Sequence, residues 1–133
     1  MYPAAVEAYG VIYKSVENAY QASMTMDIGW LERIRIATPH EAKKLNRQMP
    51  VRPDKDAVKL ATMKILDARK FENHPELLKR LQGTGNKYLV EGNVWHDNFW
   101  GDCGCKKCKN ISGLNHAGIV LMKVRNTLCG TLQ

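Results

Sequence analysis

Three of the four cysteines, Cys103, Cys105 and Cys108, lie within six residues of one another. This Cys-x-Cys-x-x-Cys spacing is too tight for a disulfide framework and suits a tetrahedral zinc site. A fourth ligand is available from three residues: Cys129, His96 or His116. A tight cluster in a Lys-rich loop also describes reduced, mobile thiols. The pattern therefore predicts either a structural zinc site or free thiols.

Glu17 is the second feature that could do chemistry, because a helix is expected to begin beside it at Ser15. A carboxylate in the first turn feels the positive end of the helix dipole, which favours its charged form. Gln21 lies one turn further on the same face and Tyr20 is close by, so the three can form a polar group on one side of the expected helix. Taken alone, Glu17 also fits a surface capping role, and Tyr20 fits a core position.

A third group combines aromatic side chains with acids. Trp95, Phe99 and Trp100 lie near Glu91 and Asp97 in the sequence. Such residues could stack a flat base while a carboxylate assists proton transfer. Trp100 equally fits a core residue, and Glu91 a partner of a buried cation.

Helices are expected to position most of these residues. The spacing of apolar residues and capping signals predicts helices over about 16–27, near 30–34, and over 39–48, 54–71, 73–83 and 115–128. Short strands are expected at 11–13, 88–90 and 98–100, and an irregular Cys-rich loop at 101–113. The fold class expected is mainly α with a small β element (α+β), in one compact domain spanning 1–133.

The charge is large and unevenly distributed. The chain has 133 residues and a net charge of +7; residues 1–32 hold four acids and one lysine, net −3, so the remainder carries +10. Such an excess favours anionic partners, either a phosphorylated small molecule or nucleic acid, although a solvated basic surface also fits. Neither a membrane span nor a secretory signal is visible, so a cytoplasmic protein without a membrane partner is expected.

The order of short motifs resembles the NADAR family. Residues 13–22, Tyr-Lys-Ser-Val-Glu-Asn-Ala-Tyr-Gln-Ala, are similar to the family signature Tyr-x-Ser-x-Glu-His-x-Tyr-Gln-Ala. Further blocks follow in the family's order: Ala37–Lys43, Arg52-Pro53-Asp54, Lys59, Met63, Lys70-Phe71, Leu77-Leu78, Thr84-Gly85, Leu89-Val90-Glu91, Trp100-Gly101, Gly113–Gly118, Leu121-Met122 and Arg125. No single block is specific, but their order over residues 2–128 is.

The resemblance implies an N-glycosidase that hydrolyses the N-glycosidic bond of a phosphorylated ribose compound. The substrate implied is a riboflavin-biosynthesis intermediate or ADP-ribose on a base, with nucleic acid as a conceivable carrier. Cleavage passes through an oxocarbenium-like state, so the reaction needs an ionised carboxylate, and Glu17 is expected to be base or nucleophile. The expected catalytic residues are Glu17, Asp97 and Glu91; the expected substrate-binding residues are Tyr20, Gln21, Arg52, Lys59, Trp100, Gly101, Asn115 and Arg125, with Arg47 a further candidate.

No cofactor is expected to be required, and the resemblance makes any zinc at Cys103, Cys105 and Cys108 structural. Asn18 stands where the family usually has His, and Asn46 where it usually has Gly. The family pattern usually begins earlier than Met1-Tyr2-Pro3, so a first segment is expected to be missing here. The competing interpretation is a basic, zinc-stabilised nucleic-acid-binding module without catalysis, with Lys106, Lys107 and Lys109 contacting phosphates.

Overall fold

The computed structural model describes residues 4–130. Residues Met1-Tyr2-Pro3, before which the resemblance places a missing first segment, lie outside the described part. Contacts divide the chain into two units, residues 1–75 and 76–133, and each is described here by itself. No helix within residues 4–130 has the length and apolar character needed to cross a membrane.

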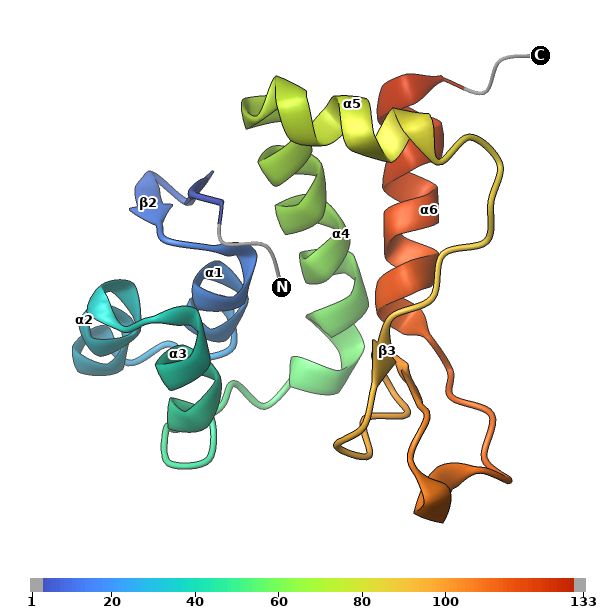
Figure 1. The fold of residues 1–133 in the computed structure, drawn as a ribbon. Helices are drawn as coiled ribbons and strands as arrows, with labels where there is room; N and C mark the ends of the chain where they lie inside the picture. The colour runs from blue at the N-terminus through green and yellow to red at the C-terminus, as the bar shows by residue number, and fades with distance from the viewer. Residues whose placement is uncertain (1–3, 131–133) are drawn as a thin grey trace. The chain divides into compact units, whose positions relative to one another are not determined.

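The first unit begins with a hairpin and continues as helices (Figure 1). Strands β1 (Val6–Ala8) and β2 (Val11–Tyr13) pair antiparallel. Tyr9 and Gly10 join them with φ values of 55° and 78°, the left-handed backbone that a tight two-residue turn requires. The helices that follow are α1 (Val16–Ser23), α2 (Ile28–Ile36), α3 (Pro39–Leu45) and α4 (Lys55–Asn73).

Helix α1 lies at the centre of this unit and packs against α2, α3 and α4. Val16, Ala19 and Met24 are buried along it, as the apolar spacing predicted. Asn18 is fully buried, and its Nδ2 donates to the carbonyl oxygens of Ile34 and Ala37, both at 2.9 Å. These two bonds satisfy carbonyls at the end of α2, so the residue found where the family usually has His ties α1 to α2.

The second unit is built around one long helix. It contains most of α5 (Pro75–Gly83), then β3 (Gly92–Asn93), β4 (Asp102–Cys103), the 3₁₀ turn η1 (Lys106–Cys108) and α6 (His116–Cys129). β3 and β4 form a short parallel pair, in which Gly92 faces Asp102 and Asn93 faces Cys103. The segment after α5 runs back along α6 (Figure 1). The mainly helical class with a small β element is therefore confirmed.

The strands expected at 88–90 and 98–100 were wrong. The backbone carbonyls of both segments accept hydrogen bonds from groups outside any sheet. In the first segment, the carbonyl of Leu89 accepts from the Asn115 side chain at 2.8 Å. The carbonyls of Asn98, Phe99 and Trp100 accept from the backbone N–H groups of Leu114, His116 and Ala117. These three carbonyls accept from N–H groups at and just before the start of α6, which have no partner within the helix. Carbonyls used in this way are not available to pair with a neighbouring strand.

Several helix ends also differ from the prediction. Helix α1 stops at Ser23, earlier than predicted, and Asp27 caps the next helix with its carboxylate accepting from the Trp30 N–H. Asp54 does not cap α4; its carboxylate pairs with Arg52. Gly83 is the last residue of α5, and Gly85, with φ of 58°, makes the expected left-handed turn.

Candidate active site

Glu17 lies in the first turn of α1, where the sequence placed it. The hydroxyl of Ser15 accepts from the Asn18 N–H at 3.1 Å and caps the helix. Glu17 is half-buried, and its Oε2 accepts a hydrogen bond from Gln21 Nε2 at 2.8 Å. The amide therefore orients the carboxylate.

Gln21 has an acceptor that the described residues leave unused. The residue is 3% exposed, and its Oε1 has no hydrogen-bond partner within residues 4–130. A buried amide oxygen without a partner costs roughly 1–3 kcal/mol. With its Nε2 held by Glu17, this oxygen is a buried polar atom close to the carboxylate and closed to solvent in the structure.

Tyr20 lies on the same helix and is electrostatically coupled to two acids. Its side chain is buried, and this burial, followed by the charges of Glu17 and Asp56, raises its pKa to about 12. The phenol therefore keeps its proton at neutral pH and can donate a hydrogen bond. Burial and its helix face also fit a core residue, so its contact with substrate remains a prediction.

This pKa predicts a loss of stability at high pH. The folded pKa lies above the ordinary value of 10.0, so the Tyr20 contribution is complete below pH 10 and is lost as the pH rises toward 12. The difference corresponds to roughly 3 kcal/mol at most. We expect Tyr20→Phe to flatten the fall in unfolding free energy between pH 10 and 12 in denaturant titrations. An unchanged slope in the variant would contradict the assignment.

The two predicted phosphate ligands of the first unit lie on either side of the start of α4. Lys59 Nζ pairs with Asp56 Oδ1 at 3.1 Å, and Arg52 Nη2 donates to Asp54 Oδ2 at 2.9 Å. Asp56 and Asp54 are exposed, so these ion pairs contribute little to stability. The Arg52 guanidinium also donates from Nη1 to the Ser23 carbonyl at 3.4 Å.

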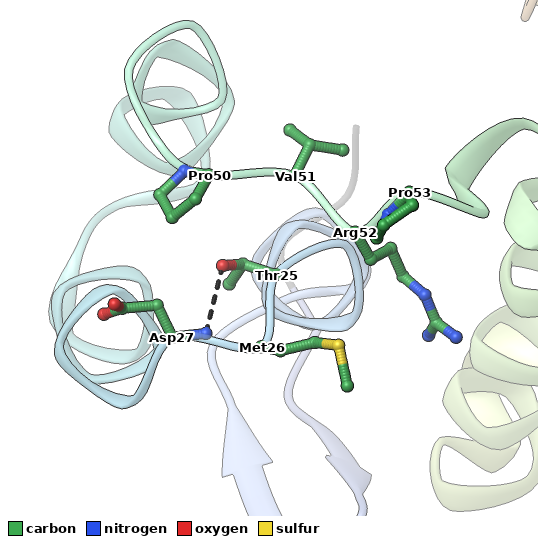
Figure 2. Close-up of a pocket in the computed structure, with 7 residues that line it drawn as sticks. All are labelled: Thr25, Met26, Asp27, Pro50, Val51, Arg52 and Pro53. Carbon is green, nitrogen blue, oxygen red and sulfur yellow. Dashed lines mark hydrogen bonds between the residues drawn. The ribbon is translucent and has the colours of Figure 1, made fainter.

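Arg52 is also anchored to the end of α1. Its backbone N–H donates to the Met24 carbonyl at 2.7 Å. It lines a pocket of about 350 Å³ formed by two chain segments, residues 25–27 and 50–53 (Figure 2). Figure 2 shows the Arg52 guanidinium extending away from Asp27. Glu17 does not line this hollow, so the pocket marks a place beside Arg52 and does not by itself define the reacting centre.

The predicted residues of the second unit hold its loops together. Asn115 is buried: its Oδ1 accepts from the Glu91 N–H at 2.9 Å, and its Nδ2 donates to the Leu89 carbonyl. Its side chain does not cap α6, contrary to expectation. Gly101 allows close approach, because a Cβ there would overlap the Glu91 carbonyl. These contacts show that Asn115 and Gly101 hold neighbouring segments of the second unit together. Their contacts with substrate remain predictions.

Asp97, Trp100 and Arg125 are likewise engaged within the second unit. Asp97 Oδ1 accepts from the N–H groups of Phe99 and Trp100 at 3.1 and 2.9 Å. The ring of Trp100 meets that of Phe99 edge-on, with centroids 5.0 Å apart. Buried Arg125 donates from Nη1 to Thr84 Oγ1 and the Lys87 carbonyl. Catalytic roles for Asp97 and Glu91, and phosphate binding by Arg125, remain predictions.

The structure brings the three clustered cysteines together with His96. The four side chains offer ligand atoms that all lie within 4.8 Å of one another, a set that could hold a metal ion. Burial acts to raise the pKa of the Cys103 thiol, but hydrogen bonds from Cys105, His96 and Cys108 outweigh it and lower that pKa to about 7. Of the three side chains considered as a fourth ligand, His96 is the one that lies in this cluster.

Asp56 is the residue that sequence reasoning missed. It lies in the first turn of α4, pairs with Lys59 and contributes to the raised pKa of Tyr20. The sequence did indicate its pairing with Lys59, because Asp56 lies three residues before Lys59 and both side chains share one helix face. Only the packing of α1 against α4 relates it to Tyr20.

A model of the NADAR domain matches residues 2–129. The chain belongs to the NADAR family. One domain model thus spans both units. An N-glycosidase from Nostoc punctiforme is 36% identical over 137 residues, covering 98% of this chain and 84% of the relative.

Two further relatives of this NADAR chain are longer than it is. The chloroplastic riboflavin biosynthesis protein PYRR of Zea mays is 29% identical over 133 residues, which cover 90% of this chain but 20% of that protein. The NMR structure of the E. coli protein YbiA superposes with a TM-score of 0.83 at 30% identity, covering 96% of this chain and 74% of YbiA. The fold is therefore that of a solved structure of similar sequence.

Proposed function

We propose that this protein is an N-glycosidase that hydrolyses the N-glycosidic bond of a phosphorylated ribose compound, with Glu17 as the reacting carboxylate. The observation that supports this most is the pair formed by Glu17 and Gln21. Gln21 orients the carboxylate through Nε2 and presents a buried, unsatisfied Oε1 next to it. The 36% identical relative named an N-glycosidase supports the same reaction class.

In the proposed reaction, the bond between the anomeric carbon and nitrogen breaks and its electron pair leaves with the nitrogen. The sugar then carries positive charge, and the Glu17 carboxylate either takes a proton from the attacking water as base or bonds to the anomeric carbon as nucleophile until water hydrolyses that bond. Water supplies the hydroxyl of the released sugar and the proton taken up by the leaving nitrogen. Gln21 keeps the Glu17 carboxylate oriented through Nε2, and the protonated Tyr20 phenol donates to a sugar oxygen.

Arg52 and Lys59 are the proposed ligands of the phosphate. Each is half-buried and is paired with an exposed acid, which a phosphate can replace. A hydrogen bond to a charged group contributes about 1.5–3 kcal/mol. Removing the substrate phosphate should therefore raise KM by roughly 10²-fold or more.

The test is to incubate the purified chain with a phosphorylated ribosylamine of the riboflavin-biosynthesis type and with its dephosphorylated counterpart, measuring free reducing sugar. We expect turnover of the first and a much higher KM for the second. ADP-ribosylated bases, free and within an oligonucleotide, form the second arm and separate the two substrate classes.

Absence of sugar release from every one of these substrates would overturn the proposal. A silent protein that retains duplexes with a steep salt dependence would favour the nucleic-acid-binding alternative, in which Lys106, Lys107 and Lys109 contact phosphates.

A further inference from the structure

We infer that His96, Cys103, Cys105 and Cys108 form a mononuclear structural zinc site in the second unit, separate from the proposed Glu17 chemistry. The inference rests on the side-chain geometry of the cluster. Three soft thiolates and one imidazole are a donor set that selects zinc among the common divalent ions.

The distances fit one tetrahedral ion. His96 Nδ1 lies 3.3 Å from Cys105 Sγ, 3.5 Å from Cys108 Sγ and 4.0 Å from Cys103 Sγ. Zinc bonds of about 2.3 Å to sulfur and 2.0–2.1 Å to nitrogen, at tetrahedral angles, place nitrogen and sulfur about 3.6 Å apart. The observed values scatter around this separation, so an ion fits after shifts of a few tenths of an ångström.

The backbone at His96 supports a ligand role. Its φ is 70°, a left-handed conformation that a histidine adopts at a cost of about 1–2 kcal/mol. The chain turns at His96. The Asn93 side-chain oxygen accepts from the N–H groups of the two residues that flank it, Trp95 and Asp97. The turn is thus fixed from both sides, and it directs the imidazole at the three sulfurs.

The surroundings also suit bound thiolates. The Cys105 N–H and the Asn98 side-chain amide point at the sulfurs of Cys103 and Cys108, each at 3.5 Å. Such N–H donors stabilise the negative charge on metal-bound sulfur. Three thiolates and one Zn²⁺ leave a net charge of −1, which three neighbouring lysines can balance: Lys106, Lys107 and Lys109.

The consequence concerns the whole segment 92–113. Its regular structure is limited to two strands of two residues and a three-residue 3₁₀ turn, so loop contacts hold most of it in place of a helix or a sheet. A site closed by four protein ligands leaves no position for a reacting water and acts as a cross-link. The ion would therefore hold the loop that carries Asp97 and Trp100, without taking part in bond cleavage.

The first experiment uses the wild-type chain, purified under reducing conditions. Metal analysis should give one zinc per chain. Exchange for cobalt should give the intense visible absorption of a tetrahedral cobalt site together with a sulfur-to-cobalt charge-transfer band. A chain that carries no zinc and yields no such spectrum with added cobalt would overturn the inference.

The second experiment identifies the ligands with matched variants. His96→Asn removes the imidazole but keeps a residue that tolerates the left-handed backbone. We expect it to weaken zinc affinity by more than ~100-fold in chelator competition, since even partners outside the ligand shell change affinity by 10–100-fold. Cys129→Ser alters the cysteine outside the cluster and should bind zinc like wild type. Equal loss in both variants, or none in His96→Asn, would overturn the assignment.

Discussion

Replacing Glu17 by Gln should lower kcat by about 10³-fold or more, in the range expected for loss of a catalytic carboxylate. The substitution is nearly isosteric, and the new amide oxygen can still accept from Gln21 Nε2, so the first turn of α1 should keep its structure. What is lost is the negative charge that stabilises the oxocarbenium-like state. Single-turnover and steady-state measurements on the phosphorylated ribosylamine report this directly.

The matched control for this variant is Glu72→Gln. Glu72 is exposed near the end of α4, so its substitution removes one negative charge from the same unit without touching α1. It should leave kcat and thermal stability within error of wild type. If Glu17→Gln retained more than about one tenth of wild-type activity with an unchanged circular dichroism spectrum, Glu17 would not be the reacting carboxylate.

Gly118→Ala should destabilise the protein by about 3 kcal/mol, the size expected when a packed site is overfilled. Gly118 is buried on α6, and a Cβ there would overlap the Leu89 carbonyl and the Asn115 side-chain amide. These same groups bond each other at 2.8 Å and hold the segment after α5 against α6. The methyl group must therefore either break this bond or move the helix.

The direction of the stability change distinguishes a steric clash at Gly118 from an ordinary effect of helix propensity. In an open helix, Gly→Ala stabilises by up to ~1 kcal/mol, so the clash must outweigh a favourable change in propensity. Gly83, the last residue of α5, provides the control because an added Cβ meets nothing within 4 Å. Urea titrations should show Gly83→Ala equal to or more stable than wild type. A Gly118→Ala variant as stable as that control would show that the close approach is not needed.

Local signals in the sequence were sufficient for most helices. The Thr38 capping box, with Pro39 and Glu41, forms as predicted because its hydrogen bonds join residues three apart and need no partner from elsewhere. Ser15 and the left-handed turn at Gly85 succeed for the same reason. The boundary errors fall where a polar side chain had a choice of partners, as when Asp54 pairs with Arg52 instead of capping α4.

The strands of the second unit failed because their backbone partners are distant in sequence. Residues 98–100 look extended in isolation, but their carbonyls accept from backbone N–H groups at and just before the start of α6, sixteen or seventeen residues further along the chain. No pattern within residues 98–100 indicates that distant N–H groups will bind these carbonyls. The same holds for Asn115, which begins α6 but whose side chain binds residues 89 and 91.

For the candidate site, the sequence alone determined the residue types and their helical spacing: Glu17 and Gln21 on one face, and three cysteines in one loop. Only the tertiary structure decided three further points. Packing of α1 buried the Gln21 amide, and its oxygen has no hydrogen-bond partner among the residues that the structure describes. Packing against α4 added Asp56 to the surroundings of Tyr20. The left-handed turn at His96 chose the fourth member of the cysteine cluster, because a ligand is selected by distance in space and not by spacing along the chain.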